Sequence, residues 1–193
     1  MNKRIVLKVL GLLFLLPNIA IAHTGAGETT SLVHGLIHPI GGLDHLLAMI
    51  AVGIWAAQLG GRALWVVPSA FVTAMIVGGS VGFLGLALPF VETGIAASVL
   101  VLGLLVAGAF KLPTLFSAFI VGLFALFHGY AHAAEMAITM STVFYSVGFV
   151  MATAMLHAVG ITLDIGLRKV HFDIFNRFIG GTIALSGLYL MFA

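Results

Sequence analysis

The chain has 193 residues, of which 62% are hydrophobic and only 7% are charged, and its mean hydropathy is +1.23. Soluble domains carry about a quarter charged residues, so this composition excludes a water-soluble fold and places most of the chain in lipid. The formal net charge is only +2 and cysteine is absent, which excludes disulfides and thiolate metal sites and leaves nucleic-acid binding without support.

Residues 1–22 have the pattern of a secretory signal peptide. A positively charged start precedes a short apolar run, and Ala20-Ile21-Ala22 forms an A-x-A cleavage site. The alternative, an uncleaved membrane helix, is disfavoured because Pro17-Asn18 interrupts the apolar run. Cleavage would leave His23 at the start of a mature chain of residues 23–193. There its imidazole and the free α-amine form a natural chelate for a metal ion, although a chance placement of this histidine is the alternative.

Six apolar blocks follow, and each is close to the roughly 20 residues that an α-helix needs to cross a bilayer. We expect membrane helices at residues 39–59, 63–88, 94–110, 113–136, 139–164 and 174–192. The predicted fold class is therefore an all-α membrane protein. It is a bundle of six transmembrane helices that forms a single domain, residues 23–193, after the cleaved signal peptide. Residues 24–37 are more polar and are expected outside the membrane.

The basic residues of the mature chain support this count. All of them lie in or next to the connections after the first, third and fifth expected helices, with the last of them in the first turn of the sixth: Arg62, Lys111, Arg168, Lys169 and Arg177. The opposite side holds Glu92 and, at the end of the fourth expected helix, Glu135, but no Lys or Arg. The positive-inside rule then places the mature N-terminus in the periplasm and the basic connections in the cytoplasm. Five or seven helices would break this pattern.

The start of the first expected helix carries His38, Asp44 and His45. Pro39 suits the first helical turn, and Gly41-Gly42 loosens the backbone of that turn. Asp44 lies where the positive end of a helix dipole favours an anion. A carboxylate at this place would also make the position usable for a cation.

A second cluster closes the fourth expected helix. His128, His132 and Glu135 stand at i, i+4 and i+7, so they share one helical face. This helix runs from inside to outside, which brings the second cluster to the same membrane depth as the first. Ionisable side chains at that depth indicate function, and imidazole and carboxylate ligands suit Ni, Co, Cu, Zn or Fe. Mutual hydrogen bonding without a metal is the alternative.

Other features carry weaker signals. Glycines within the helices indicate close helix packing. His157 and Asp164, on the fifth expected helix, and His171 and Asp173, in the loop after it, could together form an exit station for an ion. The alternative is that His171 and Asp173 belong to a plain solvated loop. His34 lies one turn before His38 and would guard the entrance at most, and Glu92 is expected to be a solvated loop residue.

The two clusters resemble the signatures of the HupE/UreJ family of nickel and cobalt permeases. Residues 38–49 match the family pattern HPxxGxDHxLxM in full. Residues 127–135 match FHGxAHGxE, except that Ala133 replaces a glycine. The resemblance implies uptake of Ni²⁺, or Co²⁺, across the bacterial inner membrane, with the ion as substrate and not as a prosthetic group. It also implies partners among the metallochaperones of hydrogenase or urease maturation.

We therefore predict a non-enzymatic permease with a metal site near the periplasmic side. Its predicted ligands are His23, His38, Asp44, His45, His128, His132 and Glu135. The rival interpretations are a membrane metalloenzyme, a b-type haem protein and an accessory protein that binds metal without transporting it. The enzyme is disfavoured because the chain has no adjacent His-His pair and no large cytoplasmic loop. The choice between Ni²⁺ and Co²⁺, the energy source and the oligomeric state stay open at this point.

Overall fold

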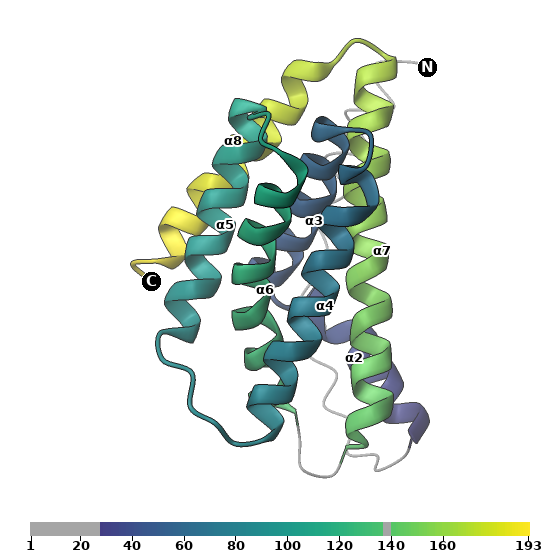
Figure 1. Ribbon diagram of the computed structural model, residues 1–193, viewed down its shortest axis with the longest axis vertical. Coiled ribbons are helices and arrows are strands. Elements are labelled where there is room, and N and C mark those ends of the chain that lie inside the picture. Colours follow the sequence, from purple (N-terminus) through teal and green to yellow (C-terminus); the bar gives the residue numbers. More distant parts are fainter. Residues whose placement is uncertain (1–27, 137–139) are drawn as a thin grey trace.

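The computed structural model describes residues 28–136 and 140–193, which form seven α-helices and no strand (Figure 1). The helices are α2 (Glu28–Gly41), α3 (Leu43–Leu59), α4 (Ala63–Phe83), α5 (Val91–Gly108), α6 (Thr114–Glu135), α7 (Thr142–Lys169) and α8 (Asp173–Leu190). The expectation of an all-α protein is confirmed for this part of the chain. The predicted signal peptide, residues 1–22, and His23 lie outside the described residues.

Several of these helices could cross a bilayer, and the chain is a membrane protein. Among the described helices, α4, α5, α6 and α7 are long and apolar enough to do so. The pair α2 and α3 would be a fifth span if the two are counted as one broken helix with a bend of 82°. The helix α8, which corresponds to the sixth predicted span, is not among these candidates. Its first turns contain Asp173, Asn176 and Arg177.

The start of the first predicted span differs from the sequence prediction. The helix α2 continues through Pro39 to Gly41, and α3 begins at Leu43 after a break at Gly42. Pro39 therefore lies in the last turn of α2, and the prediction that it occupies the first turn of a membrane helix is wrong. Gly42 has an extended backbone, with φ −95° and ψ 116°. This extended residue ends α2, and the chain bends by 82° before α3 begins.

The helix α3 lies at the centre of the bundle, and residues 51–58 within it are all buried. It contacts every other described helix. Around it, α4 packs along α6, α5 packs along α8, and α2 packs along the N-terminal part of α7. The polar segment that was expected outside the membrane thus includes a helix docked on the bundle (Figure 1).

Glycines set the closest helix contacts, as the sequence predicted. A Cβ added to Gly78 of α4 would lie 2.1 Å from the carbonyl oxygen of Leu126 on α6. A Cβ on Gly53 of α3 would lie 2.2 Å from the carbonyl oxygen of His157 on α7. Backbones can approach this closely only where the side chain is absent. The glycines therefore fix which helices pair and at what depth.

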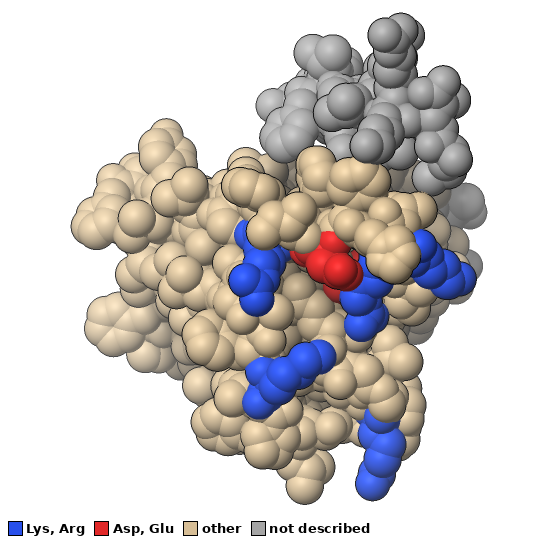
Figure 2. All heavy atoms as spheres, turned by 90° about the horizontal axis from the view of Figure 1, so that it is seen from above, with Lys and Arg blue, Asp and Glu red and all other residues tan. Residues whose placement is uncertain are grey.

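The basic residues gather at the end of the bundle where α3, α5 and α7 terminate (Figure 2). There Arg168 forms an ion pair with buried Asp164 and donates a hydrogen bond to the carbonyl oxygen of Ala57, at 2.8 Å. The Lys111 amino group donates to the carbonyl oxygen of Gln58. Both cations therefore bind the last carbonyl groups of α3, where the negative end of a helix dipole favours positive charge.

Candidate metal centre

The described residues of the predicted metal site come from three helices. His38 lies in the last turn of α2, Asp44 and His45 lie in the first turn of α3, and the remaining three lie in the last turns of α6: His128, His132 and Glu135. The break at Gly42 makes this arrangement, because it turns α2 away from the axis of α3 and toward the end of α6. The site stands at the opposite end of the bundle from the basic residues (Figure 1).

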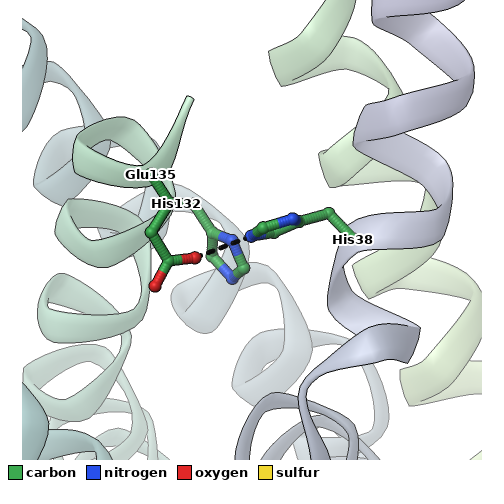
Figure 3. A group of neighbouring side chains, drawn as sticks. All are labelled: His38, His132 and Glu135. Carbon is green, nitrogen blue, oxygen red and sulfur yellow. Dashed lines mark hydrogen bonds and ion pairs between the residues drawn. The ribbon is translucent and has the colours of Figure 1, made fainter. Parts of the chain in front are cut away.

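His38, His132 and Glu135 form the tightest group, which we term the His/His/Glu triad (Figure 3). One ligand atom from each residue lies within 4.8 Å of the others. The Nε2 atom of His38 is 2.8 Å from Oε2 of Glu135, and the ring centroids of His38 and His132 are 4.8 Å apart. Two imidazoles and a carboxylate are suitable ligands for a borderline divalent ion. The triad could therefore hold a metal ion.

His132 links the triad to the interior of the protein. Its side chain is almost fully buried, and neither ring nitrogen has a hydrogen-bond partner among the described residues. A buried polar atom left without a partner costs about 1–3 kcal/mol. A metal ion bound to this imidazole would satisfy one of the two nitrogens. The ring centroid of His45 lies 4.2 Å from that of His132, so a second imidazole is within reach of the same ion.

Asp44 orients His45. Its Oδ1 atom accepts a hydrogen bond from the backbone N–H of His45 and another from the Nδ1 atom of the His45 ring, both at 2.7 Å. Because Nδ1 carries the donated proton, the neutral ring keeps its lone pair on Nε2. That Nε2 atom is buried and has no hydrogen-bond partner among the described residues. A carboxylate that holds an imidazole in this way is typical of metal sites, where it fixes the tautomer and the ring orientation.

Ser98 on α5 performs the same task for His128, and sequence reasoning missed it. The Ser98 hydroxyl donates to the carbonyl oxygen of Ile95 at 2.7 Å and lies 2.8 Å from Nε2 of His128. The single hydroxyl proton of Ser98 is donated to Ile95, so the hydroxyl oxygen accepts a hydrogen bond from Nε2–H of His128. The lone pair of the ring is then on Nδ1, which is buried without a described partner. The only signal in the sequence is one serine within an otherwise apolar run.

A row of imidazole and phenyl rings leads from the triad into the bundle. The centroids of His45 and His128 are 4.7 Å apart, and those of His128 and Phe71 are 5.7 Å apart. Beyond Phe71 stands His157, with a centroid distance of 5.1 Å. The predicted site is therefore not one tight cage. It is a triad with two further histidines, His45 and His128, in a row behind it.

Other residues singled out from the sequence lie apart from the triad. Asp164 is fully buried at the opposite end of the bundle, in an ion pair with Arg168. Asn176 donates a hydrogen bond to Asp164 at 2.7 Å. Glu92 was expected in a loop but lies exposed in the first turn of α5, because this helix begins earlier than predicted. His34 lies one turn before His38 on α2 and is half-buried.

Comparisons with known proteins agree with the pattern of the two clusters. A protein-family model described as "HupE / UreJ protein" matches residues 11–190. The chain is also similar to "Protein HupE" of Rhizobium leguminosarum bv. viciae, with 48% identity over 180 residues. That alignment covers 91% of this chain and 92% of the relative. No solved structure matches the chain.

Proposed function

The chain belongs to the HupE/UreJ family, and from that premise we propose that it is an inner-membrane permease that imports Ni²⁺ or Co²⁺ as its substrate. The observation that carries the proposal is the His/His/Glu triad, whose three ligand atoms lie within 4.8 Å of one another at the end of the bundle away from the basic residues. Two of its members, His132 and Glu135, share one face of α6, and the third arrives on α2.

In this proposal the triad receives the ion and passes it to His45 and then to His128. Centroid distances of 4.2 Å from His132 to His45 and 4.7 Å from His45 to His128 let one imidazole nitrogen engage before another is released. The carboxylates of Glu135 and Asp44 offset the charge of the ion in a setting of low dielectric constant. The protein contributes neutral imidazole ligands, the form in which histidine binds metals.

The proposal includes a membrane orientation. The signal peptide, residues 1–22, is cleaved, the mature N-terminus is periplasmic, and α8 crosses as a sixth span beside α5. The gathering of Lys and Arg at the far end of the bundle supports this orientation under the positive-inside rule (Figure 2). His23 would then lie on the same side as the triad and join it as a further ligand. Metallochaperones of hydrogenase or urease maturation would take the ion in the cytoplasm.

Uptake of radioactive ⁶³Ni²⁺ by sealed proteoliposomes tests the proposal. We expect the wild-type chain to accumulate the ion, and we expect His132→Ala and Glu135→Gln each to reduce uptake by about tenfold or more. His34→Ala, one turn away from the triad on α2, should transport normally. Equal uptake by wild type and His132→Ala would refute the proposal. Binding of the ion by the wild type without accumulation would indicate an accessory protein that only binds the metal.

The same vesicles measure specificity and coupling. Competition by unlabelled Co²⁺, Zn²⁺ and Cu²⁺ ranks the substrates, because similar ligand sets bind all these ions and affinity alone does not separate them. A proton gradient imposed in either direction then shows whether transport is coupled to protons or is facilitated diffusion.

A further inference from the structure

His157 lies in the middle of α7 and is buried, with 2% of its surface exposed. Neither of its ring nitrogens has a hydrogen-bond partner among the described residues. An imidazole left in this state loses its hydrogen bonds to water and gains none in return, which destabilises the fold. An apolar residue of similar size would fill the same place without this penalty. The side chain therefore suits a ligand that arrives from elsewhere.

Helix packing does not account for the imidazole. At this depth α3 and α7 meet through their backbones: the Cα atom of Gly160 lies 3.0 Å from the position that a Cβ on Gly53 would take. The carbonyl oxygen of His157 takes part in that contact, whereas its ring points to the other neighbour, Phe71 on α4, at a centroid distance of 5.1 Å. The close approach of the helices thus depends on glycine and not on the histidine side chain.

The ring of His157 continues the row of histidines that begins at the triad. Phe71 contacts both His128, with centroids 5.7 Å apart, and His157, with centroids 5.1 Å apart. A phenyl ring offers no ligand to a metal ion, so Phe71 separates the two histidines as an apolar step. An ion that leaves His128 toward the basic end of the bundle would next meet the unpartnered nitrogens of His157.

There is also open space beside His157. A groove of about 370 Å³ lies between α4 and α7, with a lining that includes Leu64, Pro68, Ser69, Thr73 and His157. Ser69 and Thr73 are the polar neighbours of His157 in this lining, whose other members are apolar. Nitrogen and oxygen donors together suit a borderline divalent ion.

We propose that His157 is a second binding station for the divalent cation, separated from the His/His/Glu triad and its two following histidines by Phe71. Its place in a transport path rests on the function proposed above. Binding of a metal ion at His157 does not depend on that function, and it can be measured in the purified full-length chain.

Titration of the detergent-solubilised chain with Co²⁺ tests the binding. We expect His157→Phe, which keeps a ring against Phe71, to bind one equivalent fewer than the wild type while the remaining equivalents keep their affinity. His34→Ala serves as the matched control and should bind as the wild type does. A His157→Phe variant that binds as many equivalents as the wild type would overturn the proposal.

A second measurement avoids any change at His157. In a variant with His38, His45, His128 and His132 all replaced by alanine, the triad and the two following histidines are removed, and the X-ray absorption spectrum of the remaining bound Co²⁺ should still show imidazole scattering. Absence of imidazole-bound Co²⁺ in this variant, with the chain folded and monodisperse, would also overturn the proposal.

Uptake in sealed vesicles separates this inference from the function on which it rests. If the wild type binds the additional equivalent but accumulates no ⁶³Ni²⁺, the permease proposal fails and the station at His157 stands. If the wild type accumulates ⁶³Ni²⁺ and His157→Phe does so at the same rate, the permease proposal stands and the place of His157 in the path is refuted. A loss of about tenfold or more in His157→Phe, with binding at the triad unchanged, supports both.

Discussion

One carboxylate oxygen of Asp44 accepts two hydrogen bonds from its neighbour His45, from the backbone N–H and from Nδ1, each at 2.7 Å. Because both donors belong to the same residue, the ring is held in one orientation relative to the first turn of α3. The opposite ring nitrogen then faces the interior without a described partner. Two residues that adjoin in the chain thus form a complete orienting unit, at the point where α2 and α3 meet.

Asp44→Asn should weaken metal binding without unfolding the protein. The amide accepts only on its oxygen and can present its NH₂ group to Nδ1 instead, so His45 loses its fixed tautomer. Loss of an orienting carboxylate typically costs 10–100-fold in metal affinity, and we expect this loss in equilibrium dialysis with ⁶³Ni²⁺. Asp173→Asn is the matched control, because Asp173 also lies in the first turn of a helix but is exposed and remote from the site. An equal effect of both variants would contradict the orienting role of Asp44, because Asp173 is remote from the site.

Ser98→Ala should lower metal affinity by about tenfold through His128. Without the hydroxyl, the Nε2 proton has no acceptor and the ring is free to exchange tautomers. Ser117→Ala provides the control. Ser117 is also fully buried, but among the described residues its hydroxyl donates to the carbonyl oxygen of Pro113, four residues earlier in the chain, at 3.2 Å. Ser98→Thr restores a hydroxyl and should recover binding. Normal binding by Ser98→Ala would refute the role that we assign to this residue.

Gly42→Ala should impair uptake while leaving the fold intact. A Cβ on Gly42 would lie 2.8 Å from Oδ1 of Asp44 and 3.2 Å from Nδ1 of His45, so it would displace the orienting pair. These atoms belong to side chains that can move, so we expect membrane abundance and melting temperature to be close to those of the wild type. Gly41→Ala, with nothing within 4 Å of the added Cβ, should transport normally. A similar uptake rate in the two variants would contradict the prediction.

Gly78→Ala should destabilise the bundle. Its Cβ would meet the carbonyl oxygen of Leu126 at 2.1 Å, and this backbone cannot give way without separating α4 from α6. Overpacking of this kind costs about 1–3 kcal/mol, which a lower melting temperature in detergent would report. Gly181→Ala, whose Cβ would meet nothing within 4 Å, should be neutral or slightly stabilising. If Gly78→Ala melts no lower than Gly181→Ala, the close contact is not essential to the pairing of α4 and α6.

Part of the candidate site follows from local sequence alone. The spacing of His128, His132 and Glu135 predicts one helical face, and α6 presents His132 and Glu135 together in the triad. The prediction succeeds because helical periodicity depends only on neighbouring residues. Asp44 likewise lies near the start of its helix, as predicted, although this helix begins at Leu43 and not at Pro39.

The partners across the site could not be predicted in the same way. The contact of His38 with Glu135 depends on the 82° bend between α2 and α3 and on the docking of α2 against α7. Ser98 meets His128 only because α5 and α6 lie side by side. Such contacts join residues distant in the chain, and no local pattern encodes them.

The sequence by itself determined the membrane class, the helical content, the two ligand-rich clusters and the end of the bundle that carries the basic residues. These follow from composition, hydropathy and the helical repeat, which are properties of short stretches of chain. Only the tertiary structure decided that the clusters form a triad with two further histidines in file, that Asp44 and Ser98 orient two of the imidazoles, and that His157 stands beyond Phe71 without a described partner. The reason is physical: helix pairing is set by where glycine backbones can touch, and that depends on the packing of the whole bundle.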